Sequence, residues 1–269
     1  MPLVIPYPVM DPVAIAIGPI AIRWYALAYL LGLVIGWLYG RQLAKLSPYA
    51  VKPADVDEFL SWATLGVVLG GRLGYVLFYK PGYYLDHPFE ALAVWHGGMS
   101  FHGGLLGVVI AGVTYCRLRK LNTAAFADVI FCVAPIGLCL GRIANFVNGE
   151  LPGRATDVPW AMVFPGYGPL PRHPSQLYQA AMEGAALFLI LLILSRWTAI
   201  RARPGLLSGA FLVGYAVFRM IGELFREPDA HLGFVFGGAT MGQLLSVPML
   251  LIGAALITRA IRRQPLSAP

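Results

Sequence analysis

Charged residues are scarce in this sequence, at 12% of 269 residues, whereas 58% are hydrophobic. A water-soluble domain of this length needs far more charge on its surface, so the composition excludes a soluble globular protein. Cysteine is scarce too. Cys116, Cys132 and Cys139 lie in apolar segments without C-x-x-C or metal-ligand spacing, so we expect reduced packing residues rather than disulfides or a metal site.

Several catalytic signatures are also missing. The sequence has no G-x-x-x-x-G-K-[ST] segment for nucleotide phosphates, no H-E-x-x-H pair for zinc and no G-x-S-x-G nucleophile elbow. These absences argue against the enzyme classes that depend on those motifs. We expect a protein that works without a metal or a cofactor.

Long apolar runs are abundant. A helix needs about 20 mostly apolar residues to cross a bilayer, because its backbone polar groups must be satisfied internally. We therefore predict an all-α, polytopic membrane protein, folded as a single transmembrane helical domain over residues 1–269. A polar stretch at about 147–173, rich in Pro and Gly, predicts a small cap. Seven segments meet the length criterion, roughly at 19–39, 58–79, 98–116, 126–146, 176–195, 206–225 and 238–258.

Glycines recur at four-residue spacing in these segments. Such small residues let helix backbones approach closely in a membrane, so they predict a compact bundle rather than a particular function. The sets are Gly32, Gly36 and Gly40; Gly66, Gly70 and Gly74; and Gly137 and Gly141.

Basic residues between the spans indicate orientation. The stretches RQLAKLSPYAVK, RLRK, RWTAIRAR and TRAIRR hold twelve of the twenty Lys and Arg residues. They all fall on one side if the helices alternate in direction, and the positive-inside rule makes that side cytoplasmic. We predict that the N-terminus and the cap lie on the outer side and the C-terminus on the cytoplasmic side. The first ten residues lack a charged n-region, so we expect no cleavable signal peptide.

Orientation does not explain the remaining eight basic residues, which fall with all five histidines in or above the predicted outer half of the membrane. Arg72, Arg142 and Arg219 interrupt apolar spans, where a cation costs at least a few kcal/mol unless it faces a polar interior. Three such arginines on different helices predict an anion site. The other five are Arg23, Lys80, Arg154, Arg172 and Arg226.

Alternative explanations stay open for each arginine. Arg219 has Glu223 at i+4 and Arg226 at i+7, so one helical stripe can neutralise its own charges, and Arg72 can snorkel to the headgroups. Arg142 has a stronger case for function. Asn145, Asn148, Glu150 and Arg154 follow it where the helix leaves the membrane, which predicts a lined cavity whose amides and Glu150 orient the guanidinium groups.

Two further residues are candidates at the same depth. In HGGMSFHGGLLG, His102 precedes two glycines that permit close approach of a backbone or a substrate. Histidine titrates near neutral pH and suits a general base, although a lone histidine at an interface is often structural. Tyr25 is either an aromatic anchor at the membrane surface or a hydrogen-bond donor to a lipid phosphate.

Four segments resemble, in order and spacing, hallmark segments of the bacterial prolipoprotein diacylglyceryl transferase family. They are HGGMSFHGG, GRIANFVNGELPGR with Thr two residues later, HPSQLYQ and FRMIGELFREPD. The resemblance implies a multi-pass protein of the inner membrane with its active site toward the periplasm and no nucleic-acid partner. It also implies transfer of the diacylglyceryl group of phosphatidylglycerol to the lipobox cysteine of preprolipoprotein signal peptides, the first step of lipoprotein maturation. One departure is Gln179, where the resemblance leads us to expect Glu.

This reaction assigns roles to the candidate residues. We expect Arg142 and Arg219 to hold the phosphate and His102 to be the base for the thiol. The other predicted substrate-binding residues are Tyr25, Arg72, Asn145, Glu150, Gly153, Arg154 and Glu223. A transporter or binding protein for an anionic lipid or metabolite is the alternative, but it requires polar lining in the cytoplasmic half, which is almost wholly apolar.

Overall fold

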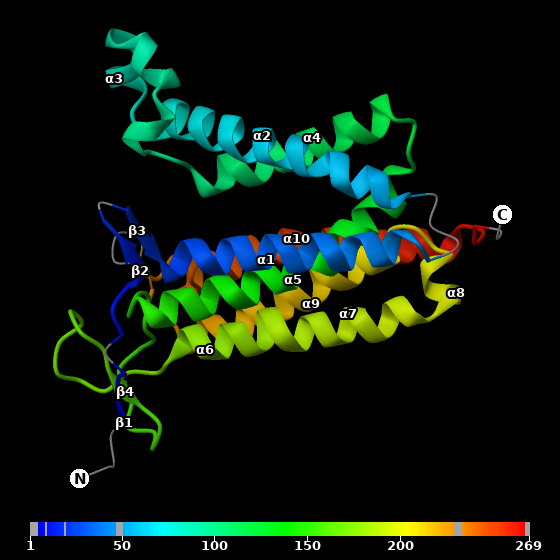
Figure 1. The fold of residues 1–269 in the computed structure, drawn as a ribbon. Helices are drawn as coiled ribbons and strands as arrows, with labels where there is room; N and C mark the ends of the chain where they lie inside the picture. Colours follow the sequence, from blue (N-terminus) through cyan, green and yellow to red (C-terminus); the bar gives the residue numbers. More distant parts are fainter. Residues whose placement is uncertain (1–4, 9, 19, 47–50, 229–232, 267–269) are drawn as a thin grey trace. The chain divides into compact units, whose positions relative to one another are not determined.

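Seven long helices dominate the computed structural model, which describes residues 5–8, 10–18, 20–46, 51–228 and 233–266 (Figure 1). Each is long and apolar enough to cross a membrane. This confirms the predicted all-α polytopic fold with seven spans, although helix ends differ from the predicted ones by a few residues. The helices are α1 Trp24–Ala44, α2 Pro53–Phe78, α4 Phe101–Leu118, α5 Thr123–Val147, the combined α6–η3–α7 run at Ser175–Arg196, α9 Leu206–Glu223 and α10 Met241–Arg262.

The chain divides into two compact units. The first comprises Met1–Gly40 and Asp128–Pro269, and the second comprises Arg41–Ala127. The second unit is built on α2 and α4, joined by the short helices α3 Pro81–Asp86, η1 Pro88–Leu92 and η2 Val94–His96. The first unit holds most of α1, most of α5 and the helices that follow it.

Glycines bring α2 and α4 into close contact in the second unit. A Cβ atom at Gly66 would lie 2.7 Å from the Gly107 carbonyl oxygen, and one at Gly74 would lie 2.8 Å from Gly103 Cα. No larger side chain fits without separating the helices. The predicted packing role of the Gly66–Gly70–Gly74 series is confirmed, and Gly103 of the HGG segment is one of its partners.

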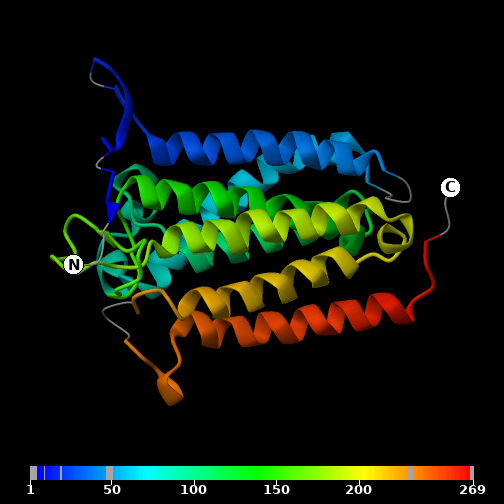
Figure 2. The same cartoon turned by 90° about the horizontal axis from the view of Figure 1, so that it is seen from below.

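The long helices of the first unit run side by side along a common direction (Figures 1 and 2). Gly32 of α1 packs on Gly137 of α5, where a Cβ at Gly32 would lie 3.4 Å from Gly137 Cα. The cap lies at one end of this unit, and α8 Thr198–Arg201 lies with the end of α10 at the other (Figure 1). There the backbone N–H of Leu266 donates to the carbonyl of Ala202.

A buried carboxylate fixes the start of α9. Asp128 of α5 accepts hydrogen bonds from the backbone N–H groups of Gly205, at 2.9 Å, and Ser208, at 2.7 Å. The Ser208 hydroxyl adds a third bond. These unpaired amides of a helix N-terminus favour an anion, so Asp128 joins the ends of two helices.

A β-hairpin precedes the first span. Strands β2 Val13–Ile17 and β3 Ile20–Arg23 pair antiparallel, and Gly18 between them has φ +56°, which glycine adopts without strain. Alternating Val, Ile and Ala favour strands over a helix here. The predicted span at 19–39 therefore begins too early, and α1 starts at Trp24.

In the cap, the N-terminal segment pairs with the polar stretch that follows α5. Strand β1 Ile5–Pro6 pairs parallel with β4 Met162–Val163. Tyr7 packs with Phe146 and Phe164, and its hydroxyl donates to the Phe146 carbonyl at 2.6 Å. The cap thereby closes over the end of α5, next to the polar residues that follow Arg142.

Candidate functional site

Arg142 of α5 and Arg219 of α9 share one buried carboxylate, Glu183. Its Oε2 lies 3.7 Å from Arg142 Nη2, and its Oε1 lies 3.5 Å from Arg219 Nη1. Glu183 is fully buried, whereas the arginine side chains keep 19% and 11% of their surface exposed. The structure thus brings together two arginines that are 77 positions apart in the sequence, through a residue that sequence analysis missed.

An irregular helical segment presents Glu183. It lies in η3 (Ala180–Ala186), a π-helical stretch between α6 (Ser175–Gln179) and α7 (Leu187–Arg196). Such segments are rare and often mark functional sites. At Gly184, a Cβ would lie 2.6 Å from Cys139 Cα, so this glycine lets α5 approach. Cys139 lies three residues before Arg142, which explains how Arg142 reaches Glu183.

A second carboxylate, Glu223, holds the other side of Arg219. Its Oε1 lies 2.6 Å from Arg219 Nη2 and 3.2 Å from Arg226 Nη1. At Gly242, in the first turn of α10, a Cβ would lie 2.7 Å from this oxygen, so α10 closes the cluster there. The alternative in which Arg219, Glu223 and Arg226 neutralise one another at the end of α9 is therefore correct as far as these contacts go. With Glu183 and Arg142 added, three guanidinium groups face two carboxylates, a formal charge of +3 − 2 = +1.

Unsatisfied polar atoms concentrate at this cluster. A buried polar atom without a hydrogen bond costs about 1–3 kcal/mol, so native proteins contain few of them. Both Glu183 oxygens, Arg219 Nη1 and Gln179 Nε2 are buried without a hydrogen-bond partner within the described part of the chain. Arg219 therefore has a donor available for an anion.

Amides hold the carboxylate of Glu150 beside this cluster. Asn145 Nδ2 donates to Glu150 Oε2, and Asn148 Nδ2 donates to Glu150 Oε1, both at 3.2 Å. Gln176 Nε2 donates to the Glu150 carbonyl at 2.6 Å. Tyr25 of α1 interacts electrostatically with both Glu150 and Arg142. Four predicted residues, Tyr25, Arg142, Asn145 and Glu150, thus lie in one neighbourhood.

The cap is fastened to the end of α9 at Gly153 and Arg154. Arg154 Nε donates to the Arg226 carbonyl at 2.9 Å, and its Nη2 donates to the Glu223 carbonyl at 3.1 Å. Gly153 N–H donates to the His173 carbonyl at 2.8 Å. A Cβ at Gly153 would lie 2.7 Å from His173 Cβ, which no side chain tolerates. Both residues therefore position the helix end that carries Arg219 and Glu223.

Burial also affects the histidine of this junction. Desolvation lowers the pKa of the His173 imidazole below its ordinary value, because burial disfavours the charged form. Its Nδ1 lies 3.2 Å from the Tyr178 hydroxyl. A neutral imidazole here adds no positive charge to the neighbouring cluster.

Arg72 lies in the second unit and is engaged by backbone carbonyls. Its Nε donates to Ala91 at 2.8 Å, its Nη2 to Glu90 at 2.6 Å, and its Nη1 to Gly97 at 2.5 Å and Gly98 at 3.3 Å. The side chain thereby closes the segment between α2 and α4. These bonds give it a structural function, in addition to the predicted contact with substrate.

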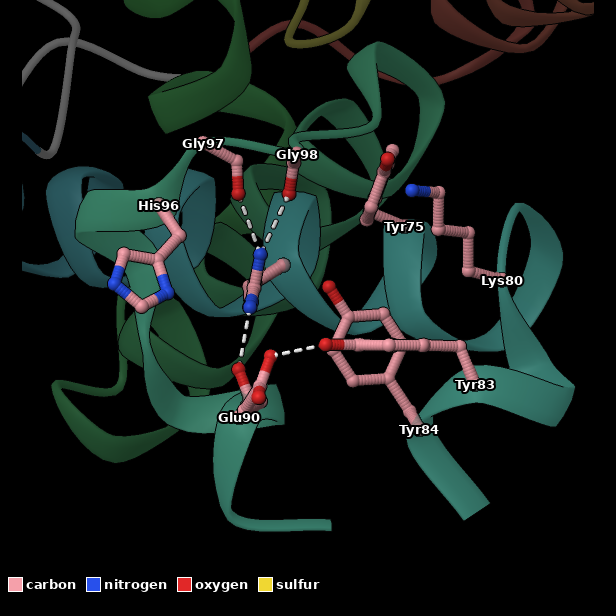
Figure 3. A pocket seen from close by; sticks show the side chains of 9 residues that line it. Tyr75, Lys80, Tyr83, Tyr84, Glu90, His96, Gly97 and Gly98 are labelled. Atoms are coloured by element: carbon pink, nitrogen blue, oxygen red, sulfur yellow. Dashed lines mark hydrogen bonds between the residues drawn. The ribbon is translucent and has the colours of Figure 1, made fainter. Parts of the chain in front are cut away.

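A pocket of about 280 Å³ opens beside these carbonyls (Figure 3). Tyr75, Lys80, Tyr83 and Tyr84 line one part of it, and His96 lies on the other side. The Tyr83 hydroxyl donates to the Glu90 carboxylate at 2.6 Å, which raises the pKa of Tyr83.

His102 lies in the first turn of α4, also in the second unit. Its imidazole is exposed, and its ring is edge-on to Phe101 with centroids 5.5 Å apart. Within the described ranges it makes no hydrogen bond or ion pair. An accessible imidazole of this kind can accept a proton from a substrate, and its role as a base stays a prediction.

Comparison with known proteins gives a family. A family model described as "Prolipoprotein diacylglyceryl transferase" matches residues 12–259. Similar proteins named phosphatidylglycerol--prolipoprotein diacylglyceryl transferase include one from Paramagnetospirillum magneticum, 62% identical over 98% of both chains. Another is from Rhodospirillum rubrum, 56% identical over 98% of this chain and 97% of the relative. A third, from Methylocella silvestris, is 56% identical over the full length of both chains.

Proposed function

This chain belongs to the prolipoprotein diacylglyceryl transferase family, and from that premise we propose that its arginine cluster transfers a diacylglyceryl group from phosphatidylglycerol to a lipobox cysteine. The protein is a membrane-embedded transferase that acts with phosphatidylglycerol in the first step of lipoprotein maturation. The observation that carries the proposal is the pair Arg142 and Arg219 around buried Glu183.

The reaction is a substitution at carbon. The cysteine sulfur forms a bond to the glycerol carbon of the diacylglyceryl group, and the bond from that carbon to the phosphate oxygen breaks. The electron pair leaves with the oxygen, which yields glycerol phosphate and a thioether. The thiol proton leaves for a base, because the thiolate is the nucleophile.

Arginines suit the charge changes of this step. The phosphate carries one negative charge in the lipid and gains a second as the carbon–oxygen bond breaks. Guanidinium groups fixed in a water-poor site stabilise that developing charge before the reaction begins, so no reorganisation is needed during it. Arg142 and Arg219 provide them, while Glu223, Glu150 and Asn145 keep their surroundings oriented.

We assign the thiol proton to His102, whose imidazole is exposed at the start of α4. A positive site also favours the thiolate by itself, so the assignment requires its own pH test. We also propose that the site faces the periplasmic side of the inner membrane. The basic ends Arg196–Arg203 and Arg259–Arg263 support this, because they lie at the opposite end of the first unit from the cap (Figure 1).

Mass spectrometry tests the proposal. Purified protein is incubated with phosphatidylglycerol and a lipobox peptide, and a matched peptide with serine in place of the cysteine is the control. We expect the cysteine peptide alone to gain the mass of one diacylglyceryl group. An unmodified cysteine peptide, with phosphatidylglycerol still bound to the protein, contradicts the assigned chemistry.

A further inference from the structure

We propose that Glu183 is a positioning residue that limits the positive charge of the arginine cluster, so that the site binds a singly charged phosphodiester and releases a doubly charged phosphate product. The inference rests on the proposed function of the Arg142–Arg219 pair. It concerns the residue that connects them, which the sequence analysis did not identify.

Glu183 forms an ion pair with each of the two arginines but no close hydrogen bond with either. Its oxygens lie 3.7 Å from Arg142 Nη2 and 3.5 Å from Arg219 Nη1, which is longer than a charge-assisted hydrogen bond. Arg219 Nη1 is buried without a hydrogen-bond partner in the described residues. The carboxylate therefore holds two guanidinium groups in place while the Nη1 donor of Arg219 stays available to a phosphate.

The carboxylate of Glu183 lowers the formal charge of the arginine cluster by one unit. Arg142, Arg219 and Arg226 with Glu183 and Glu223 sum to +3 − 2 = +1. Arg154, which donates to the Arg226 carbonyl, and Glu150, which accepts from Asn145, carry opposite charges and add nothing to this sum. One phosphodiester charge neutralises the cluster.

Cleavage changes this balance. The product is a phosphate monoester, whose second ionisation has a pKa of about 6, so it carries close to two negative charges at neutral pH. The occupied site then has a formal charge of −1, which favours release. Without the Glu183 charge the cluster would be +2 and would neutralise the product instead, so the product would stay bound.

A buried polar residue next to Glu183 allows the carboxylate to be moved to a neighbouring position as a test. Gln179 lies one helical turn earlier and is also buried. A Cβ at Gly222 would lie 3.6 Å from Glu183 Oε1 and 3.4 Å from Gln179 Cγ, so both side chains contact the same point on α9. The double variant Gln179→Glu/Glu183→Gln therefore moves one carboxylate along the helix while the total charge is unchanged.

Two phosphate inhibitors of different charge distinguish an effect of the Glu183 charge from an effect on the folded structure. Glycerol phosphate is a dianion, and its methyl ester is a monoanion of nearly the same shape. We measure the ratio of their inhibition constants for the wild type, Glu183→Gln and Glu183→Asp. Glu58→Gln is the matched control, because it removes a carboxylate paired with Arg119 outside the cluster.

In Glu183→Gln, we expect inhibition by the dianion to strengthen relative to the monoanion by about a hundredfold or more, as for a unit charge roughly 4–6 Å away at an effective dielectric constant of about 20. The maximal rate should fall because product release slows. Glu183→Asp, the double variant and Glu58→Gln should keep the wild-type ratio. A merely structural role would weaken both inhibitors equally and leave the ratio unchanged.

An unchanged ratio in folded Glu183→Gln overturns the inference, and so does an equal change in Glu58→Gln. If Glu183→Gln does not fold, Gln179→Glu decides, because it adds a second carboxylate one helical turn from Glu183: inhibition by the dianion that weakens relative to the monoanion supports the inference, and an unchanged ratio overturns it. The wild type shows separately whether the proposed function holds. A wild type that forms no thioether refutes the function itself, whereas transfer with an unchanged ratio refutes the role of Glu183 alone.

Discussion

Replacing Gly153 with Ala should displace the cap from the end of α9. The added methyl group would lie 2.7 Å from His173 Cβ and 2.9 Å from the His173 carbonyl oxygen, and closer still to the Phe225 carbonyl oxygen. Ordinary contacts begin near 3.4 Å. The backbones must therefore separate by roughly 0.5–1 Å, because an opposing carbonyl cannot rotate away as a flexible side chain can.

The size of the effect follows from the bonds at this junction. The methyl group would strain two backbone hydrogen bonds, from Gly153 to His173 at 2.8 Å and from Arg154 to Phe225 at 2.9 Å. Each contributes about 1 kcal/mol, and overpacking adds about 1–3 kcal/mol, so we expect a loss of about 3–5 kcal/mol in the stability of the junction. Displacing Arg154 by about 1 Å would disturb the cluster and reduce transfer by about 100-fold.

The assay compares thermal unfolding in detergent with the initial rate of peptide modification. Gly137→Ala on α5 is the matched control, because a Cβ at this helical position meets nothing within 4 Å in the described residues. It should keep the wild-type rate and gain slightly in helix propensity. A Gly153→Ala protein with wild-type unfolding and rate would refute the reasoning, as would equal losses in both variants.

Three other substitutions give further tests. His102→Gln should lower transfer more at pH 6 than at pH 9 if histidine is the base, since the thiol ionises by itself near its ordinary pKa of about 8.5; rate–pH profiles show this, and an equal loss at both pH values means that His102 only positions substrate. Arg72→Ala leaves four carbonyl contacts unpaired, so it should reduce stability by about 3–5 kcal/mol in thermal unfolding, whereas an unchanged transition would remove its structural role. Asp128→Asn weakens the cap of α9 and should cost about 1 kcal/mol in the same assay with the KM for lipid unchanged; a raised KM would link Asp128 to the site.

Much of the fold could be predicted from the sequence because membrane spans have a simple physical signature. Length and apolarity located all seven helices, and four-residue glycine spacing indicated the α2–α4 contact between Gly66 and Gly107. The hairpin at 13–23 was missed because its Val and Ile residues also satisfy an apolar span. A strand and a helix are distinguished there by local geometry, such as the positive φ of Gly18.

The candidate site was less predictable, because its contacts join distant segments. Cations inside apolar spans indicated Arg142 and Arg219. The same argument applied to acids would have found Glu183, an acid in the apolar segment at 176–195. The π-helical turn that presents Glu183 has no comparable signature. The carbonyl contacts of Arg72 likewise depend on how residues 90–98 fold back, which residue spacing does not specify.

The most direct test of the arginine cluster is the intact mass of a lipobox peptide after a single turnover with wild-type or Arg142→Ala protein and saturating phosphatidylglycerol. Size-exclusion chromatography and thermal unfolding establish that both proteins are folded. We predict one added diacylglyceryl group with the wild type and an unmodified peptide with folded Arg142→Ala. Modification by Arg142→Ala at the wild-type rate would contradict the central claim that this arginine stabilises the departing phosphate.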